Sequence, residues 1–262
     1  MAKQLTVLWI GAHPDDCEFM AAGTMILLGK KGCKLHIATM TPGDCGTMEY
    51  STEEIARIRL GEARASAARI GAEYHCMGEK DLLVLHTEAA LKKVTELVRR
   101  VQPDIVFTQS PEDYMLDHEA ASSLARTACF TGPMPNFHTD LFPCAARTKK
   151  VPHLYYADAM GFTDIYGRPI PASIYVDISS VIATKAKMLA CHESQRSWLK
   201  AQHGIDAYLD EMRHIGATRG KEIGVRYAEG FRQHLGHAYP ADNILKKLLG
   251  DLVTEKQAYV AD

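Results

Sequence analysis

The segment Ala-His-Pro-Asp-Asp-Cys-Glu at residues 12–18 directly follows a short apolar run at residues 5–10. An apolar run of this length predicts a buried strand, here one whose carboxyl end carries an imidazole and two carboxylates. In open α/β sheets, ligands bind at the carboxyl ends of the strands. An imidazole and a carboxylate are ligands that suit zinc, and a second carboxylate can take a proton from water that the metal activates. This feature therefore predicts a metal-dependent hydrolase.

Strand-like and helix-like segments alternate along the first half of the chain. Strands are expected at residues 5–10, 33–39, 73–77 and 104–108, and helices at 18–31, 53–70, 88–101 and from about 119. Further strands are expected at 153–157 and 173–177, and further helices at 178–194 and 243–256. Strands separated by helices predict an α/β, Rossmann-like fold with a mostly parallel sheet flanked by helices. We expect a single domain over residues 1–262 with a loop-rich C-terminal half, in which the proline-containing loop at 133–143 shapes the mouth of the active site.

Composition excludes several other classes of protein. The formal net charge of -2 gives no electrostatic footprint for nucleic acid. No apolar stretch approaches the ~18 residues of a membrane span, and the N-terminal residues lack a secretory pattern. The seven scattered cysteines are typical of reduced thiols, which favours a cytoplasmic protein. The first strand is not followed by Gly-x-Gly-x-x-Gly, which argues against a dinucleotide-binding module.

Polar clusters follow three of the expected strands, at residues 13–16, 41–46 and 110–118. Because the loops at one edge of a parallel sheet converge, these clusters can build one site. The segment at 12–18, with 41–46, 59–63, 113–118, 187–195 and 229–232, resembles the LmbE-like (PIG-L) superfamily of zinc-dependent N-deacetylases. The resemblance covers most of the chain, and its first motif is the most specific.

The resemblance implies that His13, Asp16 and His118 bind zinc and that Asp15 is the general base. Two imidazoles and one carboxylate leave a coordination position for water, as catalytic zinc requires. The same ligand set also accepts Fe²⁺ or Co²⁺. The resemblance further implies that Arg59 contacts substrate, and Asp44 in its glycine-containing loop suits sugar hydroxyls.

One position departs from the family pattern. Many members have a histidine that stabilises the oxyanion or protonates the amine, where this chain has Met115. A thioether is only a weak acceptor and performs neither task. Tyr114 and His192 are the alternative donors, and a third alternative is that Asp15 handles both proton transfers.

For several of these residues a purely structural role is the alternative to a role in catalysis or binding. Asp15 or Asp16 can cap the helix that follows, and Arg59 can pair with Glu62 on a helix surface. Asp44 can be a turn residue beside a glycine. Tyr114 and His192 can serve packing as well as function.

Together with the resemblance, the sequence predicts a zinc-dependent hydrolase, and the resemblance implies that it removes an N-acyl group, expected to be N-acetyl, from an amino sugar or glycoconjugate. The expected partner is a small N-acetylated molecule, and the family favours a homo-oligomer. Two alternatives stay open: a metal-dependent amidase acting on a non-sugar amide, and a binding protein that keeps the metal without turnover.

Overall fold

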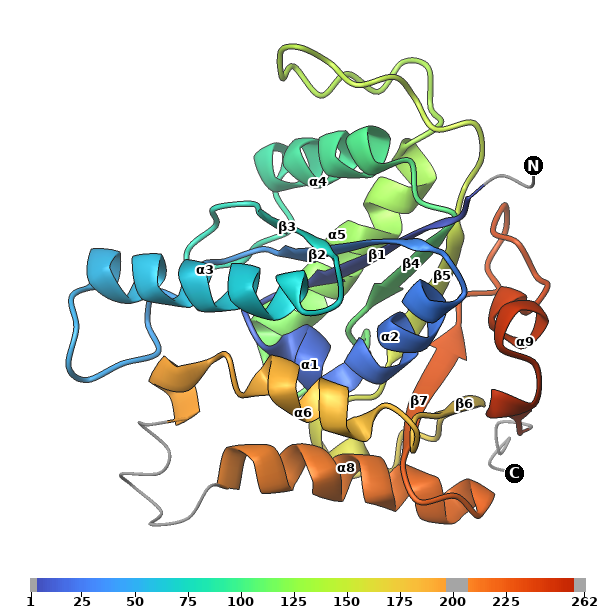
Figure 1. Cartoon of the computed structure of the whole chain (residues 1–262). Coiled ribbons are helices and arrows are strands. Elements are labelled where there is room, and N and C mark those ends of the chain that lie inside the picture. The colour runs from blue at the N-terminus through green and yellow to red at the C-terminus, as the bar shows by residue number, and fades with distance from the viewer. Residues whose placement is uncertain (1–3, 197–206, 257–262) are drawn as a thin grey trace.

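The computed structural model describes residues 4–196 and 207–256 of the chain, which form a three-layer α/β structure (Figure 1). The strands are β1 Thr6–Gly11, β2 Lys34–Thr39, β3 Glu73–Cys76, β4 Ile105–Thr108, β5 His153–Ala157, β6 Ile174–Asp177, β7 Ala228–Gln233 and β8 Val253–Glu255. The helices are α1 Asp16–Met20, α2 Ala22–Lys30, α3 Thr52–Ala68, α4 Glu88–Val101, α5 Leu116–Thr131, α6 Ile182–Leu189, α8 Ala207–Ile223 and α9 Ile244–Leu249, with 3₁₀ turns η1 Met160–Phe162 and η2 Gly250–Leu252. Among these residues no helix is both long and apolar enough to cross a membrane.

The sheet has eight strands in the order β3-β2-β1-β4-β5-β7-β6-β8. The first five are parallel, and β7, β6 and β8 continue the sheet with antiparallel pairings. This confirms the predicted α/β class. The carboxyl ends of β1, β2, β3 and β4 lie at one edge, because parallel neighbours point the same way.

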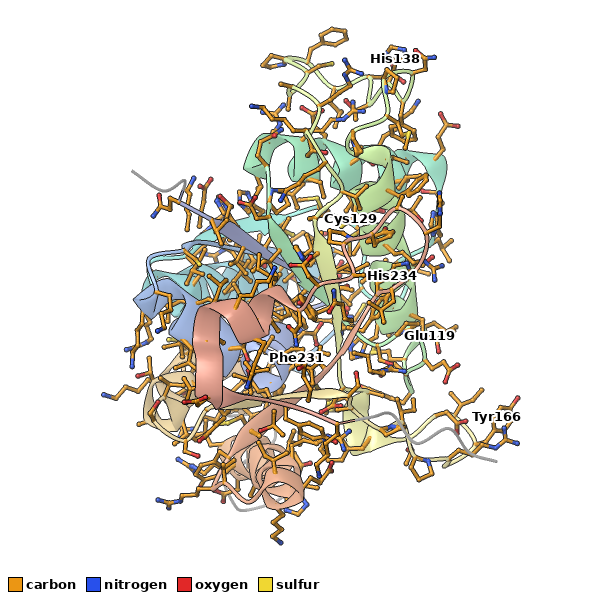
Figure 2. All side chains as sticks on the ribbon, turned by 90° about the vertical axis from the view of Figure 1, so that its right-hand side faces the viewer. Glu119, Cys129, His138, Tyr166, Phe231 and His234 are labelled. Atoms are coloured by element: carbon orange, nitrogen blue, oxygen red, sulfur yellow. The ribbon has the colours of Figure 1, made fainter. Side chains whose placement is uncertain are left out.

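Strand β1 is central because both of its faces are buried. Val7 and Trp9 pack into the core layer that also holds residues of α2, α6 and α9, while Leu8 and Ile10 pack into the layer under α4 and α5. Figure 1 shows α4 on one side of the sheet and α2, α6 and α8 on the other. Phe231 of β7 lies inside the first layer (Figure 2). A strand covered on both faces appears in sequence as a continuous apolar run.

Three predicted helices differ in the structure. The predicted helix at 18–31 divides at Ala21, whose φ is -142°, into α1 and α2. The one at 178–194 is shorter, since α6 spans only Ile182–Leu189. The prediction at 243–256 was wrong over its second half: α9 ends where Gly250 adopts a φ of +60°, and β8 then pairs with β6. The sequence reading also missed α8 and β7, so the second half is more regular than expected.

The loop at residues 133–143 does not shape the active site. It projects beyond α4 on the far side of the sheet from α8 (Figure 1), and His138 lies near its tip (Figure 2). Its residues Leu141 and Phe142 line a separate surface pocket together with residues of β3 and α4. The expectation that this loop forms the mouth of the site was therefore wrong.

A buried ion pair fixes the start of α2 behind the polar turn of β1. Glu229 accepts hydrogen bonds from the backbone amides of Gly23 and Thr24 and lies 2.7 Å from Lys185 Nζ. Lys185 also donates to the carbonyl of Phe19 and is fully buried. One carboxylate thus joins α2, α6 and β7.

We expect Lys185→Met to lower the free energy of unfolding by about 3–5 kcal/mol, because it leaves the Glu229 carboxylate buried without its cation. Urea denaturation followed by circular dichroism measures this change. Lys247→Met is the matched control: its Nζ also lies 2.7 Å from a carboxylate, that of Asp242, but the pair is exposed and contributes far less. Equal losses in the two variants would contradict the role assigned to burial.

Candidate active site and metal centre

The site begins where β1 ends. After Gly11 the chain turns through His13, Pro14 and Asp15, and α1 starts at Asp16. Asp15 has a φ of 100°, a left-handed backbone conformation that costs free energy for a residue other than glycine. This turn lets the adjacent side chains of Asp15 and Asp16 reach different partners. Neither side chain caps α1 with a hydrogen bond, which was the structural role that the sequence left open for these two residues.

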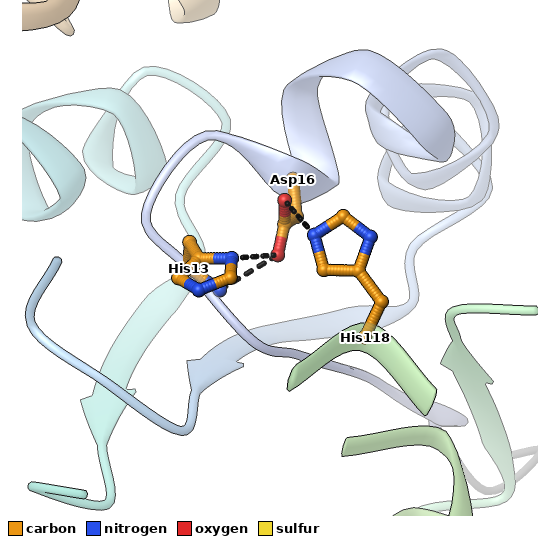
Figure 3. Close-up of side chains that lie close together, drawn as sticks. All are labelled: His13, Asp16 and His118. Carbon is orange, nitrogen blue, oxygen red and sulfur yellow. Dashed lines mark hydrogen bonds and ion pairs between the residues drawn. The ribbon is translucent and has the colours of Figure 1, made fainter. Parts of the chain in front are cut away.

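His13, Asp16 and His118 come together as the sequence predicted (Figure 3). His13 Nδ1 lies 3.6 Å from Asp16 Oδ2, and His118 Nε2 lies 3.5 Å from Asp16 Oδ1. Their ligand atoms all lie within 4.8 Å of one another, and all three residues are buried. Two imidazole nitrogens and a carboxylate at such separations suit a zinc-type ion.

Carboxylates orient both imidazoles from behind. His13 Nε2 lies 2.8 Å from Asp81 Oδ1 and 3.1 Å from Asp117 Oδ2, so its Nδ1 is the nitrogen left for a metal. His118 Nδ1 donates to Asp113 Oδ1 at 3.0 Å, which leaves its Nε2. A carboxylate behind a metal-binding histidine fixes its tautomer and raises its basicity.

The Asp16 carboxylate is also fixed by neighbours. Its Oδ2 accepts from the backbone amide of His13 at 2.6 Å and from Gln109 Nε2 at 3.0 Å. The Oε1 atom of Gln109 in turn accepts from the amide of Ala12. The ends of β1 and β4 are thereby joined through the candidate ligand.

The electrostatics of this group call for a cation. Burial alone lowers the pKa of His13, but the carboxylates of Asp117, Asp16 and Asp81 outweigh it and raise the pKa to about 12. Burial also lowers the pKa of His118, but the carboxylates of Asp16 and Asp113 outweigh it and raise the pKa to about 9. Protonated imidazoles can balance the negative charge of these carboxylates. A bound divalent ion would balance it equally, with both imidazoles neutral. The donor set therefore fits a metal ion.

Asp15 lies beside this group with partners of its own. Its Oδ2 accepts a short hydrogen bond from the hydroxyl of Tyr208 and lies 3.5 Å from Arg59 Nη2. Burial raises the pKa of Asp15, and Arg59 and Tyr208 oppose that rise. Burial also raises the pKa of Tyr208, so its hydroxyl keeps the proton that it donates.

A pocket of about 610 Å³ opens over these residues. Its polar lining includes the candidate ligands, Asp15, Arg59 and Asp81, and its apolar and aromatic lining consists of Phe19, Met20, Tyr114, Met115, Met160, Ala207 and Tyr208. Concave sites with apolar walls and a few convergent polar groups are the usual places for small-molecule binding.

The predicted substrate residues divide into two pairs. Arg59 and Tyr114 line the pocket. Asp44 does not line it: its Oδ1 accepts from the amide of Asp81 at 2.8 Å. His192 does not line it either; it is fully buried, and its Nε2 lies 3.3 Å from Glu18 Oε1.

Arg59 points inward, and the alternative pairing with Glu62 does not form. Its Nη2 donates to the carbonyl of Pro14 at 2.9 Å, and its Nη1 donates to that of Gly43 at 3.2 Å. Gly43 has a φ of +73°, and a side chain there would collide with the guanidinium. Glu62 instead accepts from the amide and hydroxyl of Ser194.

Sequence reasoning missed several residues around the site. Asp81 follows β3 at the same sheet edge as the other clusters, which was an available signal. Asp113 and Asp117 stood inside a recognised motif, but nothing in their spacing to His118 assigned them a role. Tyr208 carried no signal, because its helix was not predicted.

The chain is similar to a known family and to known enzymes. The family described as PIG-L, GlcNAc-PI de-N-acetylase, matches residues 8–129. The diacetylchitobiose deacetylase of Thermococcus kodakarensis is 30% identical over 233 residues, which cover 86% of this chain and 82% of that protein. The 4-oxalmesaconate hydratase of Pseudomonas putida is 25% identical over 243 residues, which cover 87% and 89%.

Among solved structures, the N,N'-diacetylchitobiose deacetylase from Pyrococcus horikoshii, complexed with an inhibitor, superposes with a TM-score of 0.74. It is 28% identical, and the match covers 91% of this chain and 88% of that one. The shared fold thus extends well beyond the matched family segment, into the half of the chain that supplies Tyr208.

We expect Asp113→Asn to weaken metal binding at the His13–Asp16–His118 group by about 10–100-fold, because His118 loses the carboxylate that orients it. Competition with a chromophoric chelator measures the affinity. Glu112→Gln, an exposed neighbouring carboxylate, is the control and should leave the affinity unchanged. An unchanged affinity in Asp113→Asn would show that this carboxylate does not support the ligand.

Proposed function

The chain belongs to the PIG-L, or LmbE-like, family and is a hydrolytic N-deacetylase, and we propose that it removes acetyl groups from amino sugars with the help of a metal ion and Asp15. The observation that carries the proposal is the placement of Asp15 next to the His13–Asp16–His118 group, at the floor of one pocket. A metal-binding group and a separate carboxylate base are what amide hydrolysis by activated water requires.

His13, Asp16 and His118 are the proposed ligands. We propose Zn²⁺ as the ion, and Fe²⁺ or Co²⁺ also suits two nitrogens and an oxygen. When bound, a divalent ion of this kind activates water and polarises an amide carbonyl. Asp81, Asp113 and Asp117 keep the two imidazoles aimed at the shared centre.

Asp15 carries the proton transfers. Its carboxylate takes a proton from the attacking water as the new C–O bond forms to the acetamide carbon. It then returns that proton to the nitrogen as the C–N bond breaks, so the products are a free amine and acetic acid, which releases its remaining proton to become acetate. A buried carboxylate with a raised pKa suits both directions of this transfer.

Met115 cannot donate a hydrogen bond to the substrate, but two tyrosines that can do so line the same pocket. Tyr208 donates to Asp15 and lies in the pocket wall, so we propose that it holds the base and is the nearer hydroxyl to the reacting carbonyl. Tyr114 is largely exposed and packs edge-on against His118, with 5.4 Å between the ring centroids. We propose that Tyr114 contacts the substrate. His192 and Asp44 act from behind the pocket, by supporting Glu18 and Asp81.

The pocket lining favours a sugar. Aromatic and apolar side chains cover the faces of a pyranose ring, and Arg59 reaches the pocket floor. The Nε of Arg59 is buried without a hydrogen-bond partner among the described residues and lies against the backbone of Gly43. The diacetylchitobiose deacetylase relative supports an N-acetylglucosamine conjugate as the substrate class. The single domain, the cytoplasmic location and the homo-oligomeric state stay predictions.

Acetate release together with metal content tests the proposal. The protein as purified, after chelation, and after repletion with Zn²⁺ is given N-acetylglucosamine, N,N'-diacetylchitobiose and a non-sugar acetamide. Metal-dependent acetate release from the sugars supports it. Acetate release from the non-sugar amide alone would show that the substrate is a non-sugar amide instead of an amino sugar. A bound metal without any acetate release would favour a binding protein.

The hydratase relative defines a further control. Addition of water to 4-oxalmesaconate is followed by loss of the ultraviolet absorption of its conjugated double bond. Hydration without acetate release would overturn the deacetylase assignment, since the same base and metal-binding group can serve water addition.

We expect Asp15→Asn to lower kcat by about 10²–10⁴-fold, because the amide cannot accept a proton. The bound metal should stay at the wild-type stoichiometry, since Asp15 is not one of the proposed ligands. Acetate release and metal content are measured on the same sample. Wild-type turnover, or loss of the metal along with activity, would contradict the role of Asp15 as base.

We expect Tyr208→Phe to lower kcat by about 10–100-fold with little change in metal affinity, because Asp15 loses the hydroxyl that orients it. Tyr114→Phe is the matched variant and should act mainly on KM, since Tyr114 is proposed to contact substrate. The comparison of kcat and KM in the two variants separates the roles. A larger loss of kcat in Tyr114→Phe would reverse the assignment.

A further inference from the structure

A second group of metal-binding side chains lies on the sheet edge formed by β2 and β3. His36 is on β2, and Glu73 and His75 are on β3. In the parallel register His36 faces Glu73 and Ala38 faces His75, so the three side chains project from the same face. They precede the carboxyl ends of both strands, and they share no residue with the active-site group.

The separations between their polar atoms suit one ion. His36 Nδ1 lies 3.0 Å from His75 Nε2, Glu73 Oε2 lies 3.7 Å from His36 Nδ1, and Glu73 Oε1 lies 3.9 Å from His75 Nε2. Atoms that each bind one zinc ion at about 2.0–2.2 Å can be at most about 4.4 Å apart. Every one of these separations is within that limit, so an ion requires only small side-chain adjustments.

Burial and exposure are distributed as an accessible site requires. His36 is 2% exposed and held in place by its surroundings, and the two rings are nearly parallel, with an interplanar angle of 17°. Glu73 is exposed and His75 is partly exposed, which leaves a path from solvent. Two imidazoles and a carboxylate favour zinc, copper, nickel or cobalt over magnesium or calcium.

One cation competes for this group. Lys34 Nζ lies 3.9 Å from Glu73 Oε2, on the same face of β2. A metal ion must share or displace that contact before Glu73 can bind it. The lysine therefore lowers the affinity of the group without occupying it, because both side chains are more than half exposed.

We propose that His36, Glu73 and His75 bind a second divalent transition-metal ion, separate from the active site, which joins the edge strand β3 to β2. Among the residues that the structure describes, strand β3 has a hydrogen-bonded neighbour strand on one side only. Five residues after its last residue, Cys76, comes Asp81, which contacts His13. An ion at the sheet edge thus stabilises the strand that leads into the active site.

Metal stoichiometry by equilibrium dialysis against Zn²⁺, with elemental analysis, tests the proposal on the full chain. The wild type is expected to bind one ion more per chain than His75→Gln or the doubly substituted His36→Gln, His75→Gln protein. His138→Gln, which removes an exposed histidine that belongs to none of the candidate metal-binding groups, is the matched control and should bind as the wild type does. The difference between variants is the readout, so the result is independent of whether the active-site group binds metal.

Two further variants keep the test informative if a histidine variant fails to fold. Glu73→Gln changes only an exposed carboxylate and should weaken binding of the additional ion at least 10-fold. Lys34→Gln removes the competing cation and should strengthen it. Co²⁺ absorption spectra report the loss of nitrogen ligands in His75→Gln. Equal stoichiometry in the wild type and the double variant would overturn the proposal, leaving His36 and His75 as a hydrogen-bonded pair.

Discussion

The burial of several carboxylates around two imidazoles is the constraint on which this site depends. Asp16, Asp81 and Asp117 surround His13, and each of them is largely removed from water. Buried carboxylates persist as anions only where cations or hydrogen-bond donors compensate them. The segments after β1, β3 and β4 must converge to supply this compensation, so the positions of the strand ends and the charge state of the site are linked. A metal ion bound here would compete with protons for the same nitrogens, so its affinity would depend on pH.

The left-handed backbone at Asp15 separates two roles that the sequence places side by side. Asp16 starts α1 and reaches the two imidazoles, while Asp15 reaches Arg59 and Tyr208. The strained conformation persists because the surroundings hold it: Arg59 donates to the carbonyl of Pro14. The buried ion pair at the start of α2 fixes the other end of the same segment. Strain at this turn is therefore supported from both sides.

The parallel half of the sheet and the clustering of His13, Asp16 and His118 were predictable because their signals lie in short segments of the sequence. Strands β1 and β4 are buried on both faces and appear as apolar runs, and the candidate ligands lie in the segments that follow them: His13 and Asp16 directly after β1, and His118 at the start of α5, ten residues after β4. Strand β7 was missed because Glu229 and Arg232 interrupt its apolar pattern, and these polar residues make sense only through their tertiary partners. The inward orientation of the Arg59 side chain could not be predicted from the sequence either, because it depends on Gly43, a loop residue sixteen positions away.

The groups that orient the candidate metal ligands are distinct from those that orient Asp15, the proposed base. His13 and His118 depend on aspartates that follow β3 and β4, whereas Asp15 depends on Arg59 of α3 and Tyr208 of α8. Among the described residues, no side chain hydrogen-bonds both to Asp15 and to one of the candidate ligands His13, Asp16 and His118. Substitutions can therefore change proton transfer without changing metal affinity. The pocket therefore has a hydroxyl next to Asp15 although Met115 offers no donor there, because that hydroxyl comes from Tyr208 of α8.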